Sequence, residues 1–117
     1  MHNFKKLKIW QEGINIVSDS YQLTKTFPDF EKFGLVSQMN RCSVSIPSNV
    51  AKGSSKSTDK HFNKYLEDSL DSAFEWETQL IVAFNENYLS EEKFKELEQK
   101  IKQIQQMISR FQSGLNL

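Results

Sequence analysis

The sequence predicts an all-α protein: a single domain over residues 1–117, folded as an up-down-up-down four-helix bundle. Apolar residues recur every three or four positions along nearly the whole chain, which is the period of an amphipathic helix. Only two prolines and four glycines interrupt this pattern, and the segments between them are long. The apolar fraction of 38% is enough to bury one core. Four amphipathic helices joined by short loops bury such a core most simply as a bundle.

The first predicted helix covers residues 4–26. It ends where Phe27 precedes Pro28, because a proline pushes the residue before it out of α geometry. A turn over residues 28–34 then reverses the chain. Residues at helical spacing form the predicted core face of this helix: Leu7, Trp10, Ile14, Val17 and Tyr21.

The second predicted helix begins near Leu35, and Gly53 is expected to end it. Its apolar face consists of Leu35, Met39, Cys42, Ile46 and Val50.

Pro47 interrupts this second helix and removes one backbone hydrogen bond, at a cost of roughly 3 kcal/mol. A new helix starting at Pro47 would need Ile46 as its N-cap, and isoleucine has no side-chain acceptor. We therefore expect one helix that is kinked at Pro47. Short polar groups around the proline can satisfy the disturbed carbonyls: Ser43, Ser45, Ser48 and Asn49.

The third predicted helix runs from Asp59 to Asn87, after a polar loop that supplies N-cap oxygens. Its core stripe consists of Phe62, Leu66, Leu70, Ala73, Leu80 and Phe84. A second stripe beside it contains Tyr65, Ser69, Ser72, Trp76, Gln79 and Ala83. Two interpretations remain: a wide core face, or a contact with another subunit. In the second, favoured slightly, small residues permit close approach and aromatics anchor the contact. The predicted oligomer interface is Tyr65, Ser69, Ser72 and Trp76.

The fourth predicted helix begins after Ser90, a typical N-cap residue. Leu89 before the cap and Phe94 inside the helix have the spacing of a hydrophobic staple. A seven-residue repeat, typical of nearly parallel helix packing, follows: Phe94, Leu97, Ile101, Ile104, Ile108, Phe111 and Leu115.

The net charge is zero, but its distribution is uneven. Residues 1–64 hold ten Lys and Arg against five acids, and residues 65–117 hold five against ten. This asymmetry either pairs the two halves with each other or leaves one basic and one acidic surface. The candidate nucleic-acid-binding residues are Lys52, Lys56, Lys60, Lys64 and Arg41. The N-terminal Lys5, Lys6 and Lys8 would extend this patch if the first and third helices start at the same end of the bundle. The alternative is that these lysines form only a solvent-exposed surface and bind no nucleic acid.

No pattern in the sequence indicates an enzyme. A di-iron site in a bundle needs Glu-x-x-His pairs, and none exists. One cysteine and two distant histidines do not favour zinc, and neither a glycine-rich phosphate loop nor a nucleophile elbow occurs. We predict no catalytic, cofactor or metal site. The single cysteine and the lack of a membrane-length apolar run favour a cytoplasmic protein with no membrane contact.

Several motifs together resemble one family, the four-helix-bundle proteins encoded in intervening sequences of bacterial 23S ribosomal RNA genes. They are Leu7-x-x-Trp10, Phe27-Pro28-x-x-Glu31-x-Phe33-Gly34-Leu35-x-x-Gln38, Arg41-x-x-x-Ser45-Ile46-Pro47-x-Asn49-Val50-Ala51-x-Gly53 and Ser72-x-x-Glu75-x-Glu77-Thr78-Gln79-Leu80. The chain departs from the family at Lys52, where an acid is usual.

The resemblance implies a left-handed bundle that assembles as a ring, with five subunits as the expected form. The chain is also similar to accessory proteins of diversity-generating retroelements, which share the bundle and are thought to bind RNA and a reverse transcriptase. Two functions follow as hypotheses. The first is a homo-oligomeric accessory protein that binds RNA. The second is a protein-interaction or scaffold module that binds no nucleic acid.

Overall fold

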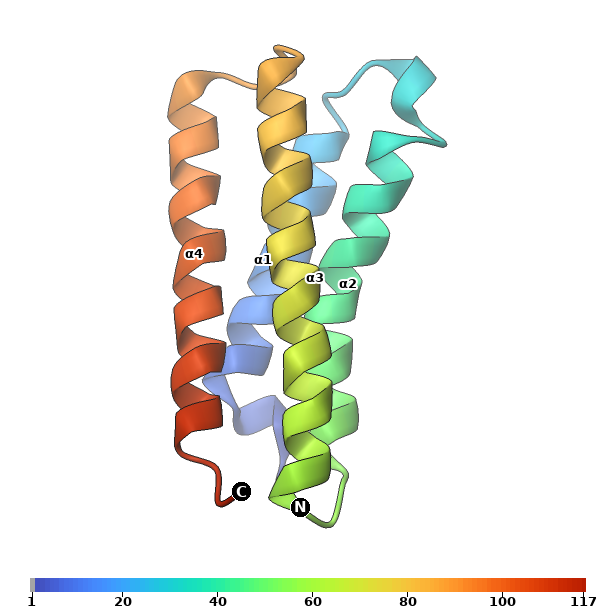
Figure 1. Cartoon of the computed structure of the whole chain (residues 1–117). Helices are drawn as coiled ribbons and strands as arrows, with labels where there is room; N and C mark the ends of the chain where they lie inside the picture. The colour runs from blue at the N-terminus through green and yellow to red at the C-terminus, as the bar shows by residue number, and fades with distance from the viewer. Residues whose placement is uncertain (1) are drawn as a thin grey trace.

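The computed structural model describes residues 2–117 as an all-α four-helix bundle (Figure 1). The helices are α1 (Lys8–Thr24), α2 (Leu35–Ser54), α3 (Asp59–Asn85) and α4 (Glu91–Ser113), with short 3-10 helices η1 (Phe4–Lys6) and η2 (Asp29–Glu31). Successive helices run antiparallel, so the predicted up-down-up-down topology is confirmed. Helix α1 lies beside α2 and α4, and α3 completes the bundle between the same two helices. A left-handed twist and a kink at Pro47 stay predictions.

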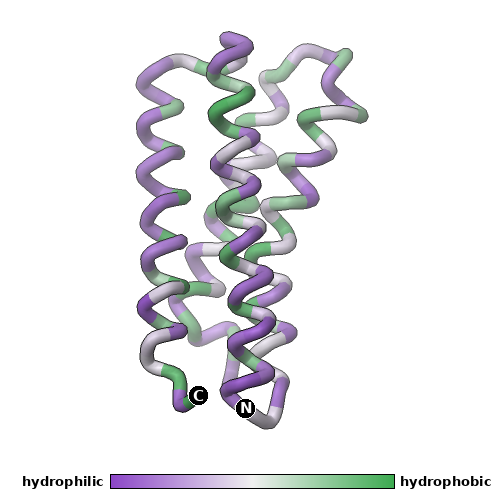
Figure 2. Tube along the Cα trace, viewed as in Figure 1, coloured by the Kyte–Doolittle hydropathy of each residue, from purple (hydrophilic) through white to green (hydrophobic). Residues whose placement is uncertain are grey.

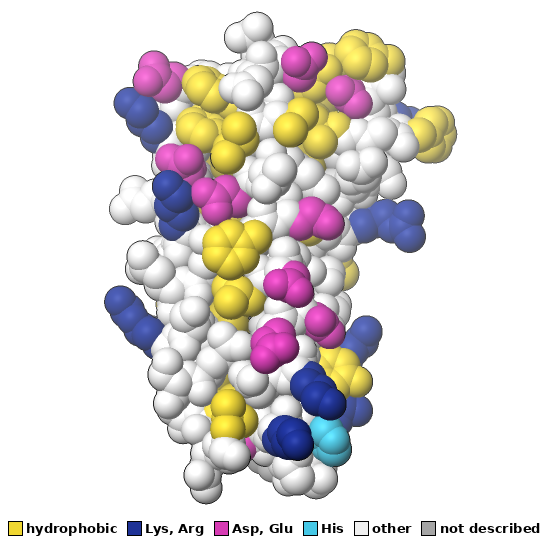
Figure 3. Space-filling view, viewed as in Figure 1, with side chains coloured by type: hydrophobic (Ala, Val, Ile, Leu, Met, Phe, Trp, Pro, Cys, Tyr) yellow, Lys and Arg dark blue, Asp and Glu magenta, His cyan; other side chains and the backbone are white. Residues whose placement is uncertain are grey.

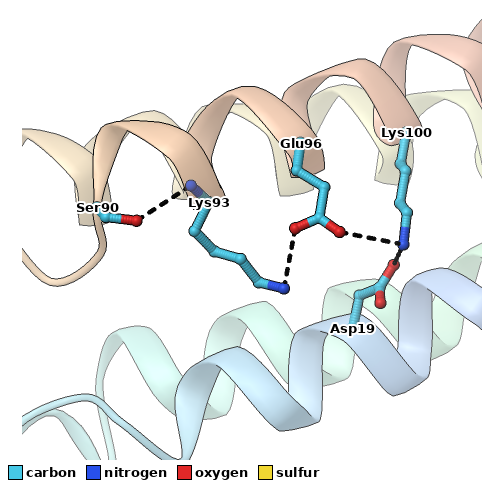
Figure 4. A network of polar contacts seen from close by, with 5 residues as sticks. All are labelled: Asp19, Ser90, Lys93, Glu96 and Lys100. Atoms are coloured by element: carbon cyan, nitrogen blue, oxygen red, sulfur yellow. Dashed lines mark hydrogen bonds and ion pairs between the residues drawn. The ribbon is translucent and has the colours of Figure 1, made fainter.

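Two helices begin at the predicted caps. The Ser90 hydroxyl accepts a hydrogen bond from the Lys93 N–H at 3.1 Å, as Figure 4 shows. The Thr58 hydroxyl accepts one from the His61 N–H at 3.2 Å. Helix α1 starts later than expected, because Leu7 has extended backbone angles and separates it from η1. No helix within residues 2–117 has the length and apolarity needed to span a bilayer.

The core confirms the predicted apolar faces of α2 and α4. Figure 2 shows that the outward side of α4 is almost continuously hydrophilic. Lys100 on this helix also reaches Asp19 on α1 at 3.3 Å (Figure 4). The fully buried side chains on α2 and α4 are Met39, Ile46, Val50, Leu97, Ile101, Ile104 and Ile108.

The predicted core face of α1 is wrong. Ile14 is 40% exposed and Tyr21 is 46% exposed, whereas Ile9 and Ile16 are each 3% exposed. The observed inner face of α1 consists of Ile9, Gly13, Ile16, Ser20, Leu23 and Thr24. A pattern of apolar residues misses this face because half of it is small or polar.

Gly13 explains how α1 approaches α2 so closely. A Cβ on Gly13 would lie 3.1 Å from the Pro47 Cβ, so the proline ring packs directly on the glycine. Helix α2 continues through Pro47 to Ser54, as expected. The neighbouring polar groups bond to backbone carbonyls. Ser43 donates to the Asn40 carbonyl at 2.7 Å, and Asn49 donates to the Ser45 carbonyl at 2.9 Å.

Gly53 does not end α2 by a left-handed turn. It lies inside the helix, is buried, and no glycine among residues 2–117 has a positive φ. A Cβ there would lie 2.7 Å from Phe62 Cδ1 and 2.9 Å from the Tyr65 Cβ. Glycine is therefore required because α2 and α3 touch at this point.

Candidate nucleic-acid interface and neighbouring surfaces

The N-terminal segment and the α2–α3 loop lie at the same end of the bundle. The His2 N–H donates to the Ser54 carbonyl at 3.0 Å, and the His2 and Phe62 rings are 5.1 Å apart. This contact places the N-terminal lysines at the same end of the bundle as those of the loop. We call the resulting surface the basic end. It consists of Lys5, Lys6, Lys8, Lys52, Lys56, Lys60 and Lys64.

The ammonium groups of the basic end are available for a ligand. All except Lys56 are exposed, and no ion pair between described residues involves any of the seven. Lys56 is half-buried, and its Nζ lies over the Tyr65 ring, 5.1 Å from the centroid. The nearby Asp59 carboxylate accepts a hydrogen bond from the Asn116 N–H at 2.9 Å.

Acidic side chains cover a different part of the surface. In Figure 3 they run along α3, and basic groups gather at the lower end of the same face. The exposed acids of this run are Glu67, Asp68, Asp71 and Glu75. The acids of α3 and the lysines of the basic end are therefore separate on this face, whereas on α4 lysines and glutamates pair with one another.

Arg41 does not join the basic end. It precedes Lys52 on α2 by eleven residues, which is about 16 Å along a helix axis. Its surroundings are a hollow of about 400 Å³ between α2 and α3, lined by Gln38, Arg41, Cys42, Ser45, Ser72, Glu75 and Gln79. Arg41 therefore lies away from the loop lysines along α2, and its predicted role in binding nucleic acid stays a prediction.

This α2–α3 hollow brings together residues of three of the motifs quoted above. The Ser45 and Ser72 hydroxyls are 2.8 Å apart, and the Cys42 thiol donates to the Ser72 carbonyl at 3.0 Å. Burial, and then the Glu75 carboxylate, raise the pKa of Cys42 to about 12. The thiol is therefore protonated at neutral pH and is a poor nucleophile. The sequence signal for this hollow is a set of polar residues within the predicted second and third helices.

The predicted oligomer interface is only partly at the surface. Trp76 and Ser69 are both 0% exposed within one chain, so their assignment to a subunit contact is wrong. The Trp76 indole N–H donates to the Ser20 hydroxyl at 3.0 Å, and Ser20 donates to the Asn40 side chain at 2.9 Å. The indole fits inside because α1 presents a small residue there. Tyr65 and Ser72 are half-buried, and their interface role stays a prediction.

Large apolar side chains are exposed elsewhere. On α1, Ile14 and Tyr21 of the stripe expected in the core are exposed, whereas Trp10 and Val17 are half-buried, and Val44 of α2 is 40% exposed. We call this surface the α1 stripe; its residues are Trp10, Ile14, Val17 and Tyr21. On the α1–α2 turn, Phe30 is 78% exposed and Phe33 is 89% exposed. Sequence reasoning missed both surfaces, because apolar spacing does not distinguish an inner face from an outer one.

Metal-binding geometry does not occur in the part of the chain that the structure describes. No group of three or more His, Cys, Asp or Glu side chains there is arranged to hold a metal ion.

Comparison with known proteins identifies relatives by sequence and by fold. Residues 5–110 match the model of the 23S rRNA-intervening sequence protein family. A similar solved structure is the crystal structure of a protein with unknown function from the S23 ribosomal protein family of Bacteroides thetaiotaomicron. Its TM-score is 0.82 at 18% identity, over 90% of this chain and 95% of that one. No curated protein matches the chain. The structural match supports the bundle fold.

Proposed function

Since the chain belongs to the 23S rRNA-intervening sequence protein family, we propose that it is a non-enzymatic, homo-oligomeric accessory protein that binds RNA through its basic end. The supporting observation is that seven lysines from three chain segments lie at one end of the bundle without an ion-pair partner among residues 2–117. Lysines that neutralise phosphates release counterions, and this release drives sequence-independent binding. A cytoplasmic location is consistent with this role.

The charge distribution also gives the RNA a direction of approach. The exposed acids at positions 67–75 of α3 repel phosphates from the middle of that helix, so the RNA backbone is directed to the basic end, which includes the start of α3. Among residues 2–117, no Phe, Tyr or Trp side chain beside these lysines is fully exposed as a stacking platform for single strands requires. The proposal therefore concerns contacts to phosphates, with little preference for base sequence.

A salt titration of RNA binding tests this function. Binding of fluorescent single-stranded and structured RNA, followed by anisotropy, should weaken steeply as salt rises. The double variant Lys56→Glu/Lys60→Glu should lose roughly tenfold or more in affinity, because it replaces two phosphate contacts with repulsive charges.

The matched control places the same charge change at the opposite end of the bundle. Lys32→Glu/Lys95→Glu alters two exposed lysines there and should retain nearly all the affinity. RNA binding that is absent in the wild type, or equally weakened in both double variants, would show that the basic end is not an RNA site.

A second candidate function is a protein-interaction or scaffold module without nucleic-acid binding. The exposed Ile14 and Tyr21 of the α1 stripe favour it, because neighbouring exposed apolar side chains mark protein contacts more often than RNA contacts. This function predicts no salt-dependent RNA binding. If the protein forms a stable assembly and the RNA stays unbound at every salt concentration, the scaffold function is favoured over the RNA-binding function.

A further inference from the structure

A buried oxygen without a hydrogen-bond partner lies on a residue that lines the α2–α3 hollow. The residue is Gln79, and its Oε1 accepts no hydrogen bond. No other buried side-chain oxygen or nitrogen among residues 2–117 lacks a partner. Buried acceptors are normally satisfied, because an unpartnered one costs free energy. Gln79 Oε1 can therefore gain a hydrogen bond from a donor that enters the hollow.

Two serine hydroxyls in the hollow leave one proton free to donate. Ser45 and Ser72 bring these hydroxyls within 2.8 Å of each other, where they share one hydrogen bond. The Asn49 side chain also donates to Ser45 Oγ at 3.0 Å. Since two hydroxyls carry two protons and only one lies between them, the other can be donated to a ligand. The hollow therefore offers a donor as well as an unpartnered acceptor.

A cation and an anion line the hollow without pairing with each other. Arg41 belongs to α2 and Glu75 to α3, and both side chains are exposed. Neither takes part in an ion pair among residues 2–117. Burial, and then the Glu75 carboxylate, raise the pKa of the Cys42 thiol, so this carboxylate lies toward the hollow. A ligand that carries both charges can therefore pair with both side chains at once.

We propose that the α2–α3 hollow binds a free α-amino acid with a polar side chain. The carboxylate of the ligand accepts hydrogen bonds from the Arg41 guanidinium and from the free serine proton. Its ammonium group donates to the Glu75 carboxylate and to Gln79 Oε1. The volume of about 400 Å³ is ample for such a ligand, and every lining side chain except Cys42 is polar or charged. Hydrogen bonds, more than apolar burial, therefore hold the ligand.

The charges around the hollow disfavour two other classes of ligand. A nucleotide phosphate would be repelled by the exposed acids at positions 67–75 of α3. A polyamine would be repelled by Arg41 and would give its guanidinium no acceptor. A zwitterion gives each charge an opposite partner. None of the seven lysines of the basic end lines the hollow, so this inference does not depend on RNA binding.

Thermal denaturation in the presence of each common protein amino acid tests the proposal first. At roughly a hundredfold excess over Kd, a bound ligand should raise the Tm of the wild type by about 5 °C or more. We expect this shift with a polar amino acid such as L-glutamine, L-asparagine or L-serine, and not with L-leucine.

Derivatives of the tightest-binding amino acid test the two charges of the ligand. Its N-acetyl form lacks the ammonium group, and its amide form lacks the free carboxylate. Isothermal titration calorimetry should show that each derivative binds at least about tenfold more weakly than the free amino acid.

Charge-neutral variants assign the two ends of the ligand to the protein. Arg41→Gln and Glu75→Gln should each weaken binding at least about tenfold. In Arg41→Gln the amide form should bind as well as the free amino acid, because the carboxylate has already lost its partner. In Glu75→Gln the N-acetyl form should do so for the same reason. Arg110→Gln and Glu92→Gln on α4 are matched controls that should bind as the wild type does, because both side chains are exposed and unpaired among residues 2–117.

Gln79→Leu separates ligand binding from support of the fold. Without ligand, this variant should be at least as stable as the wild type, because Oε1 gives up no hydrogen bond. Its affinity for the amino acid should nevertheless fall about tenfold. A loss of stability with unchanged affinity would show that Gln79 supports the fold and contacts no ligand.

Other results would overturn the proposal. The absence of any Tm shift, equal shifts with L-leucine and the polar amino acids, or full affinity for either derivative would exclude a polar zwitterion as the ligand. Equal binding by the wild type, Arg41→Gln and Glu75→Gln would place the amino acid outside the hollow. If Arg41→Gln weakens RNA binding and leaves amino-acid binding unchanged, the hollow belongs to the RNA surface.

Discussion

At the scale of single residues, small side chains decide where the helices meet. Gly13 accommodates Pro47, and Gly53 accommodates Phe62 and Tyr65. Ser20 has a comparable role, since its hydroxyl accepts the buried Trp76 N–H. Each of these residues looks neutral or unfavourable in a helix when it is considered alone. In the bundle, each allows a neighbouring side chain to enter.

Replacement of Gly53 by alanine should destabilise the protein by about 1–2 kcal/mol. Alanine improves helix propensity by about 1 kcal/mol, but its Cβ would overlap the Phe62 ring and the Tyr65 Cβ. Urea denaturation followed by tryptophan fluorescence measures the difference. Gly114→Ala is the control, because the nearest atom to its Cβ is the Phe111 carbonyl oxygen at 3.5 Å. An equal loss in both variants would argue against the α2–α3 contact.

At the scale of elements, the helix starts depend on local chemistry. Helix α4 begins where the Ser90 hydroxyl accepts the Lys93 N–H, and Glu91 and Glu92 occupy its first turn. Negative side chains there also favour the positive end of the helix dipole. The cap and the acidic first turn are formed by a few consecutive residues, so the start of α4 can be predicted from the sequence.

Ser90→Ala should cost about 1 kcal/mol, because it leaves an N–H at the start of α4 without its acceptor. The same denaturation experiment measures this loss. Ser18→Ala supplies the comparison, since Ser18 is exposed in mid-helix and should change stability by less than about 0.5 kcal/mol. Indistinguishable midpoints for the two variants would show that the cap does not stabilise the fold.

The orientation of a helix in the bundle is harder to predict than its ends. The faces of α2 and α4 were predicted correctly because most of their large apolar residues point inward, Val44 being an exception. On α1 the large residues Trp10, Ile14 and Tyr21 compete with a face that contains Gly13 and Ser20. Which face turns inward depends on Pro47 and Trp76, which are distant in sequence. Trp76 was predicted at a subunit contact for the same reason, because the sequence pattern does not show that Ser20 of α1 accommodates its indole.

At the scale of the whole molecule, the two ends of the bundle differ in chemistry. Lysines from three segments meet at one end, and the sequence predicted the loop lysines but not how the N-terminal segment joins them. The other end carries the exposed Phe30 and Phe33 and an apolar pocket beside Leu23 and Tyr88. Antiparallel helices alone do not produce this difference, because it depends on which loops carry charge.

This polarity has a consequence for binding strength. In an assembly whose rotation axis is parallel to the helices, the basic ends of all copies would lie on the same side. An RNA strand held by one copy would then meet the next copy at a high effective concentration, so avidity would multiply weak individual contacts. A substitution that breaks self-association and leaves every lysine in place should therefore bind long RNA more weakly than the wild type yet bind a very short oligonucleotide equally well. Equal binding of the long RNA by both proteins, measured at the same subunit concentration, would mean that each bundle acts alone.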